Sequence, residues 1–239
     1  LVGRSVPRLE DRKFLTGEGH FLDDLVLPRQ SHAVVVRSPH AHARIVNLDG
    51  GRARQVPGVN AVLTGTDARA DGIGYIRPNV PPTNGDGSAG FVPPYPVLAQ
   101  ERVRFVGEGV ALVVADTLEA ARDAAERVDV TYEEQPCVVG TADALAPGAP
   151  GVWEAATENL CFDWRTGDTE ATEAAFAAAA HVTRLDIINN RIAPAPLEPR
   201  TLIGIHQRGD DSYTLWAQSQ DPHLLRQWIA DNSLRVPEH

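Results

Sequence analysis

The sequence contains no methionine and only two cysteines among its 239 residues. Because it begins with Leu1 and holds no methionine, we expect the chain to be a processed or excised piece of a longer polypeptide. Cys137 and Cys161 lie far apart, so they do not form a metal-binding pair, and two thiols are too few to cross-link a chain of this length. A reducing, cytoplasmic location is therefore expected.

The chain also lacks a run of basic residues and a long apolar run. Its 22 Lys and Arg residues stand against 32 Asp and Glu residues, which gives a formal net charge of −10. Such an acidic chain is a poor candidate for binding nucleic acid or an anionic membrane. Apolar stretches such as Gly109–Ala115 are far too short to cross a bilayer. We therefore expect no nucleic-acid partner and no membrane span, although 43% apolar residues suffice for a folded core.

Residues 1–139 are predicted to form a first domain that starts with an extended arm with short turns. It includes a long loop, Asp71–Pro96, rich in glycine and proline, and loops of this length are usually functional or form interfaces. After the loop, Gly107 separates two strands and is expected to mark a bend. Asp116 or Thr117 then caps a helix that leads into another strand, which predicts a β-α-β unit. The expected elements are the arm Val2–Asp24, the strands Ala33–Val36, Val59–Leu63, Val103–Val106, Val110–Ala115 and Val128–Tyr132, and the helices Gly51–Gln55 and Thr117–Arg127.

Residues 145–239 are predicted to form a second domain, which follows a linker of small residues, Thr141–Gly151. Cys161 is expected to be a small core residue of its first strand. The last helix has an amphipathic face that needs a packing partner, so this domain is expected to be incomplete. The expected elements are the strands Asn159–Arg165, His181–Asn190, Thr201–Gln207 and Ser212–Ser219, the last two forming a hairpin, and the helices Asp168–Ala180 and Pro222–Asn232.

The histidines and carboxylates give no decisive chemical pattern. His40 and His42 would share one face of a strand and reach one metal ion, but hydrogen-bonded or solvated rings in a turn are favoured because no further ligand cluster is visible. Glu198 is expected to accept backbone N–H bonds or, as the favoured alternative, to pair with Arg191 or Arg200. The sequence matches neither a nucleophile elbow nor a phosphate-binding loop.

Gln218 and Gln220 lie at the end of a predicted strand, directly before the Asp-Pro that opens the last helix. They share one strand face if the strand extends that far, and an amide there offers both a donor and an acceptor to a ligand. Sites in open α/β folds gather at strand ends and helix N-termini. Local spacing alone still favours a turn residue for Gln220.

Taken together, several segments resemble the N-terminal part of the molybdenum-binding large subunit of the xanthine dehydrogenase, aldehyde oxidase and carbon monoxide dehydrogenase family. Each segment alone is weakly specific, whereas their order and spacing cover nearly the whole chain. The matching segments are GRSVPRLEDRKFLTGEGHFLDD, RSPHAHARI, PGVNAVLTGTD, RFVGEGVALVVADTLEAARDAAERVDVTYEEQP, LEPRTLIG and WAQSQDPHLLR.

The resemblance implies an α+β fold, with an α/β hammerhead domain (residues 1–139) followed by the incomplete start of a mixed α/β molybdopterin-binding domain (residues 145–239). It implies a cytoplasmic oxidoreductase that hydroxylates an aldehyde or an N-heterocycle, or oxidises CO, with water as the oxygen source. The implied cofactor is a molybdenum pyranopterin, in the cytosine dinucleotide form in many bacterial members. The remainder of the large subunit, an iron–sulfur subunit with 2Fe-2S centres and an FAD subunit are the implied partners.

The resemblance also implies a role for Gln220, because a glutamine at the matching strand end contacts an oxo group of the molybdenum centre. Gln218 is the neighbouring alternative. The family's glycine-rich GGGFG segment and its general-base glutamate have no counterpart in these residues, so we expect the 239 residues alone to hold no cofactor and to be inactive. The other hypothesis is a non-catalytic assembly or protein-docking module, which would suit the proline-rich loop.

Overall fold

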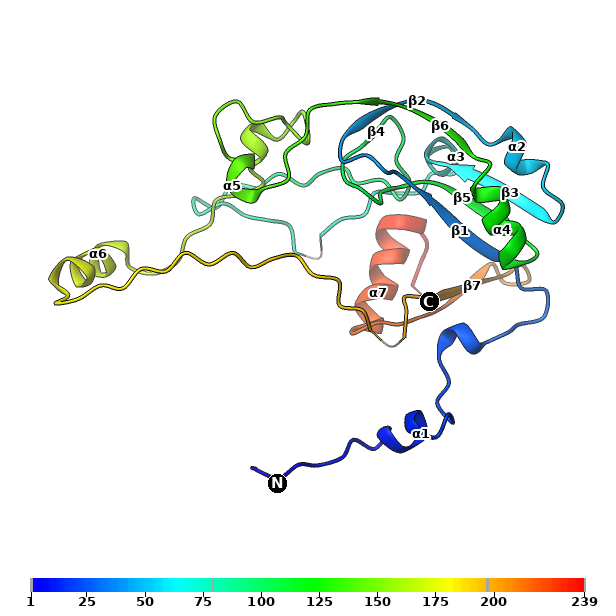
Figure 1. Ribbon diagram of the computed structural model, residues 1–239, viewed down its shortest axis with the longest axis horizontal. Helices are drawn as coiled ribbons and strands as arrows, with labels where there is room; N and C mark the ends of the chain where they lie inside the picture. Colours follow the sequence, from blue (N-terminus) through cyan, green and yellow to red (C-terminus); the bar gives the residue numbers. More distant parts are fainter. Residues whose placement is uncertain (1, 79, 197, 239) are drawn as a thin grey trace. The chain divides into compact units, whose positions relative to one another are not determined.

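The computed structural model describes residues 2–78, 80–196 and 198–238. Within them the chain forms two compact units (Figure 1). The larger unit comprises Ser31–Thr183 and the residues from His223 onward, and the smaller unit comprises the residues up to Gln30 together with Arg184–Pro222. No helix among the described residues is long and apolar enough to cross a membrane.

The larger unit is built on two three-stranded sheets in which every strand pairing is antiparallel. The first sheet has the order β1-β5-β3 and the second has the order β4-β2-β6. The strands are β1 (His32–Arg37), β2 (Ala43–Asp49), β3 (Val59–Thr64), β4 (Arg102–Val103), β5 (Gly109–Ala115) and β6 (Asp129–Glu134).

Strand β5 joins two apolar clusters because its alternate side chains point to opposite faces. Val113 is fully buried in one cluster, together with Val62 and Ala124. Val110 is fully buried in the other, together with Val103. This central position explains why the sequence of β5 is apolar on both faces.

Helix α4 (Leu118–Ala125) covers the first sheet, and it lies against β1 and β5 (Figure 1). The hydroxyl of Thr117 caps it by accepting a hydrogen bond from the Ala120 backbone N–H at 3.1 Å. The face of the helix that meets the sheet carries Ala121 and Ala124, both fully buried. The short helices α2 (Gly51–Arg54) and α3 (Gly65–Ala70) flank β3.

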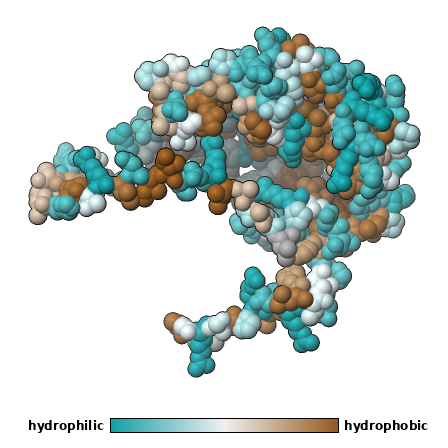
Figure 2. All heavy atoms as spheres, in the orientation of Figure 1, coloured by the Kyte–Doolittle hydropathy of each residue, from teal (hydrophilic) through white to brown (hydrophobic). Residues whose placement is uncertain are grey.

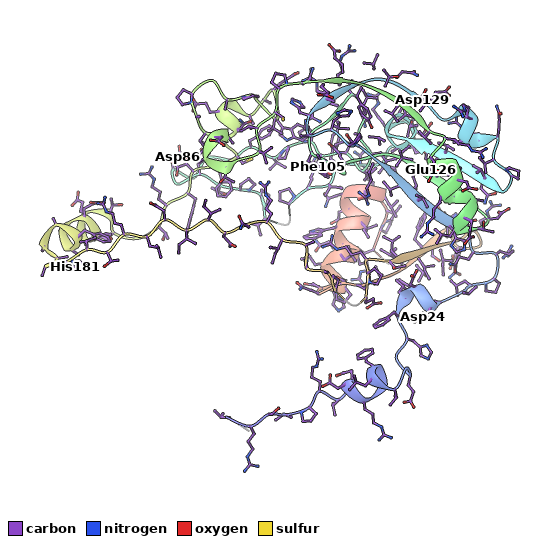
Figure 3. All side chains as sticks on the ribbon, viewed as in Figure 1. Asp24, Asp86, Phe105, Glu126, Asp129 and His181 are labelled. Carbon is purple, nitrogen blue, oxygen red and sulfur yellow. The ribbon has the colours of Figure 1, made fainter. Side chains whose placement is uncertain are left out.

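The prediction of a β-α-β unit is wrong in its topology, although each of its elements exists. β5 and β6 belong to different sheets, and β6 pairs antiparallel with β2. In Figure 3, Glu126 and Asp129 mark the turn by which the chain leaves α4 and enters β6. The spacing of apolar residues specifies a helix between two strands, but it does not specify which sheet the second strand joins.

The segment after β6 departs most from the predicted elements. It forms α5 (Thr141–Ala144), a short 3-10 turn η2 (Thr157–Asn159) and α6 (Thr169–Ala178), whereas no strand forms at Asn159–Arg165. Cys161 is exposed rather than buried in a core, so that prediction is also wrong. The reason is that this backbone bonds to the long loop instead of a sheet: Phe91 N–H donates to the Cys161 carbonyl at 2.7 Å.

The long loop between α3 and β4 also covers part of the last helix. That helix comprises α7 (Pro222–Trp228) and a π-helical turn η3 (Ile229–Leu234). Gly74 N–H donates to the Ser233 carbonyl at 3.0 Å. Leu224 and Trp228 are half-buried and line a hollow with Pro81 of the loop. The long loop therefore supplies part of the packing partner that this amphipathic face needs.

The smaller unit contains little regular structure. The expected hairpin is confirmed as β7 (Leu202–Gln207) and β8 (Ser212–Ala217), which pair antiparallel. The arm, expected to be extended with short turns, contains the 3-10 turn η1 (Leu22–Asp24) and also a short helix that was not predicted, α1 (Asp11–Leu15). The strand expected at His181–Asn190 does not form, because its backbone has no strand partner among the described residues.

Candidate functional site

The end of β8 carries the two glutamines singled out in the sequence, and the structure gives them different surroundings. Gln218 Oε1 accepts a hydrogen bond from the Thr201 backbone N–H at 3.0 Å. Gln218 Nε2 donates to the Pro199 carbonyl at 2.7 Å. Both ends of this amide are therefore engaged in holding the chain that enters β7.

Gln220 is exposed, and its side chain makes no hydrogen bond within residues 2–78, 80–196 and 198–238. It lies three residues after the end of β8 and two residues before α7 begins at Pro222. A primary amide in this position retains two N–H donors and one carbonyl acceptor. Of the two glutamines, Gln220 is the one with a side chain available to an incoming ligand.

A shallow hollow of about 630 Å³ lies beside this strand end within the smaller unit. Glu198 is at its edge, and its Oε1 accepts a hydrogen bond from the Leu22 backbone N–H at 3.0 Å. The favoured ion pair with Arg191 or Arg200 is absent among the described residues, so the backbone-accepting alternative is confirmed. The hollow is lined by Leu22, Glu198, Leu215, Trp216, Ala217, Gln218 and Ser219.

His40 and His42 have separate partners and do not converge on a metal site. His42 Nδ1 lies 2.9 Å from the Pro136 carbonyl oxygen. His40 Nδ1 lies 3.4 Å from Glu134 Oε1, and its ring packs against Tyr132 with the centroids 4.8 Å apart. No group of three potential metal-ligating side chains occurs in the described part of the chain. The favoured interpretation of hydrogen-bonded rings is confirmed.

Glu108 is a buried titratable residue that the sequence analysis missed. Its exposed fraction is 2%, and its Oε2 accepts the Arg104 backbone N–H, whereas Oε1 has no partner. Burial raises the pKa of its carboxyl, against the lowering effect of the Arg104 N–H and guanidinium. In the sequence, Glu108 stands between Gly107 and Gly109, directly before a strand that is apolar on both faces. This pattern indicates a turn and does not reveal that the carboxylate is buried.

Two domain families match the chain. The profile described as "Aldehyde oxidase and xanthine dehydrogenase, a/b hammerhead domain" matches residues 16–136. The profile described as "Molybdopterin cofactor-binding domain" matches residues 152–239. The predicted limits of the two domains, 1–139 and 145–239, stay predictions.

Similar proteins include large subunits of several oxidoreductases. The chain is 36% identical to the carbon monoxide dehydrogenase large chain of Afipia carboxidovorans, over 100% of this chain and 29% of that protein. It is 33% identical to the nicotine 6-hydroxylase large subunit of Paenarthrobacter nicotinovorans, over 96% of this chain and 27% of that protein. The chain therefore spans less than a third of these relatives.

Two solved structures also match nearly the whole chain, which again spans less than a third of each. The Cu,Mo-CO dehydrogenase in its carbon monoxide reduced state superimposes with a TM-score of 0.82 at 34% identity, covering 99% of this chain and 30% of that chain. Quinoline 2-oxidoreductase from Pseudomonas putida 86 superimposes with a TM-score of 0.81 at 33% identity, covering 99% of this chain and 29% of that chain.

Proposed function

Because the chain belongs to the aldehyde oxidase and xanthine dehydrogenase family, we propose that it is the N-terminal part of a molybdenum hydroxylase large subunit. The whole polypeptide would hydroxylate an aldehyde or an N-heterocycle, or oxidise CO, with water as the oxygen source. The observation that carries this proposal is the match of the chain, from end to end, to large subunits of this kind. The 239 residues alone are expected to be inactive because they span 29% of that relative.

The residues at the end of β8 fit the cofactor that the family implies. When bound, the molybdenum pyranopterin supplies the two-electron redox chemistry of the reaction. Gln220 is proposed to donate an amide N–H to it, because its side chain is exposed and makes no hydrogen bond among the described residues. Gln218 is the weaker candidate, since its amide already bonds Pro199 and Thr201.

The pterin dinucleotide and the electron-transfer partners are further parts of the proposal. A cytosine dinucleotide form is proposed, with 2Fe-2S and FAD centres on partner subunits. The names of the relatives, "large chain" and "large subunit", support a complex of several subunits. A cytoplasmic location accords with two exposed free cysteines, Cys137 and Cys161.

Exposed apolar side chains in the smaller unit support the remainder of the polypeptide as the immediate partner. Figure 2 shows hydrophobic side chains along the extended run after α6. An isolated two-stranded hairpin such as β7–β8 is at best marginally stable in water, so it needs further strands or a covering layer. This requirement disfavours an autonomous docking module. The most exposed apolar residues of the run are Leu185, Ile187, Ile188 and Ile192, at 77–87%.

The proposal is tested with Gln220→Ala in the complete enzyme. We expect a loss of turnover of about 10²-fold, as for removal of one preorganised hydrogen-bond donor, together with a changed molybdenum EPR spectrum. Asn189→Ala serves as a control at another exposed residue of the same unit. Full turnover and an unchanged spectrum in Gln220→Ala would reject the proposed role of Gln220.

A further inference from the structure

Two loops of the larger unit lie against each other at the edge of the first sheet. The first, called the His42 loop, comprises Ser38–His42, and the second, called the Glu108 loop, comprises Arg104–Glu108. Ser38 N–H donates to the Glu108 carbonyl, and Gly107 N–H donates to the Ser38 carbonyl, both at 2.8 Å. Figure 3 labels Phe105, within the Glu108 loop, beside the sheets.

Each loop carries one side-chain atom that is shielded from solvent and lacks a hydrogen-bond partner. They are His42 Nε2 and Glu108 Oε1, and no other such side-chain atom occurs among the residues that the structure describes. Buried polar atoms without partners are rare in folded proteins, because each one costs the free energy of its lost hydration. The two atoms belong to loops that share backbone hydrogen bonds, and His42 is among the charged groups that act on Glu108.

The hydrogen bond at Nδ1 shows that His42 Nε2 acts as an acceptor in the neutral ring. His42 Nδ1 lies 2.9 Å from the Pro136 carbonyl oxygen, which can only accept, so Nδ1 carries the proton. In the neutral ring, Nε2 is then a bare acceptor. Glu108 Oε1 is likewise an acceptor when the carboxyl is ionised. With the carboxyl ionised, the two acceptors do not bond each other, and each needs a hydrogen-bond donor.

We propose that a single internal water molecule binds between His42 Nε2 and Glu108 Oε1 and joins the two loops. Water has two O–H donors, so it can satisfy both acceptors at once. It also fits the protonated carboxyl, because water can accept the Glu108 O–H while donating to His42. Two polar partners are the minimum that internal water sites usually provide.

The charged groups around this site act on Glu108 against the effect of its burial. Burial raises the pKa of Glu108, while the Arg104 backbone N–H, the Arg104 guanidinium and His42 oppose that effect. Tyr95, from the long loop, also faces Glu108, and the pKa of its phenol is raised by burial and by the Glu108 charge. The Arg104 guanidinium is itself held over the Trp153 ring, with Cζ 3.6 Å from the centroid.

The proposal is tested first by a high-resolution crystal structure of the complete polypeptide and of its His42→Phe variant. The wild type should show an ordered water within hydrogen-bond distance, about 2.7–3.2 Å, of both atoms. The variant should lack that water. A direct bond between His42 and Glu108, or bonds from each to other protein groups with no water between them, would overturn the proposal.

A double-mutant cycle gives an independent measurement in solution. His42→Phe and Glu108→Leu each remove one anchor of the water, so we expect the double variant to lose little more stability than the worse single variant. Additive losses would contradict the shared site. If a single variant fails to fold, the wild-type crystal structure alone decides between the outcomes.

Discussion

The side chain of Gln218 is bound to Pro199: its Nε2 donates to the Pro199 carbonyl at 2.7 Å, while its Oε1 accepts from the neighbouring Thr201 N–H. These bonds fix the chain that enters β7 to the end of β8. Gln220, two residues further on, forms no such bond within the described chain. Within the described chain, the amide of Gln218 is therefore engaged in hydrogen bonds, whereas the amide of Gln220 is not.

Gln218→Ala should destabilise the complete polypeptide, because two hydrogen bonds to the backbone are lost, each contributing about 0.5–1.5 kcal/mol. Gln220→Ala is the matched control, and with both variants prepared free of cofactor it should change the stability by less than about 0.5 kcal/mol. Urea denaturation of both variants measures the difference. Equal losses of stability would mean that Gln220 is also a structural residue.

Glu108→Gln should change how stability depends on pH. Because burial raises the folded-state pKa of Glu108 above the unfolded value of about 4.3, its contribution is fully present below that value. The contribution is lost as the pH rises through the folded pKa, since the folded state then binds more protons than the unfolded state. The amide variant does not titrate, so its stability relative to wild type should increase with pH.

Urea denaturation at intervals from about pH 4 to pH 8 measures this change across the relevant window. Glu126→Gln is the matched control, because it makes the same change at an exposed residue of the same unit. Parallel stability curves for Glu108→Gln and wild type would show that Glu108 keeps an ordinary pKa.

Ile188→Glu should destabilise the complete polypeptide but not the isolated 239 residues. Ile188 is 87% exposed in the structure, and burying an isoleucine side chain contributes about 1.5–3 kcal/mol. If the remainder of the polypeptide covers it, the charged variant loses that contribution and buries a carboxylate. Asn189→Glu, at the next residue, controls for the added charge. If Ile188→Glu lowered the stability of the complete polypeptide and of the isolated 239 residues by similar amounts, the remainder of the polypeptide would not cover Ile188.

Thr117→Ala and Asp168→Ala remove equivalent helix caps and should have different effects. Thr117 caps α4, which packs on the sheet with two buried alanines, so its loss should lower global stability by about 1 kcal/mol. Asp168 caps α6, in which no residue is buried, so its loss should only fray that helix. Hydrogen exchange together with urea denaturation separates local from global effects.

The sequence predicts the first sheet of the larger unit well, because the determinants are local. Short runs of apolar and β-branched residues specify β1, β3 and β5, and the hydroxyl of Thr117 specifies the start of α4. The position of Gly107 as a bend is also confirmed, since its φ of 92° lies in the left-handed region that favours glycine.

The wrong predictions concern segments whose secondary structure depends on a residue far away in the sequence. The apolar stretches Asn159–Arg165 and His181–Asn190 are typical of strands, but a strand also needs a neighbour with free backbone groups. The first stretch bonds to the long loop, and the second has no strand partner in the described chain. The burial of Glu108 could not be predicted either, because it depends on segments that are distant in sequence, such as Ser38, whose backbone bonds to that of Glu108.

For the candidate site, the sequence selected Gln218 and Gln220 but could not separate them. Their spacing in the sequence does not show which amide bonds to the protein and which can bind a ligand. Only the hydrogen bonds between Gln218 and residues 199 and 201 show that the Gln218 amide already bonds to the backbone. The assignment of Gln220 to the cofactor rests on the family resemblance and on its available side chain.

The most direct test of the central claim is the molybdenum content of the native polypeptide that carries these residues, purified from its source cells. The account predicts a chain several times longer than 239 residues that contains one molybdenum and one pterin. A native chain of any length without molybdenum or pterin, isolated from cells supplied with molybdate, would contradict the account and favour a docking or assembly role.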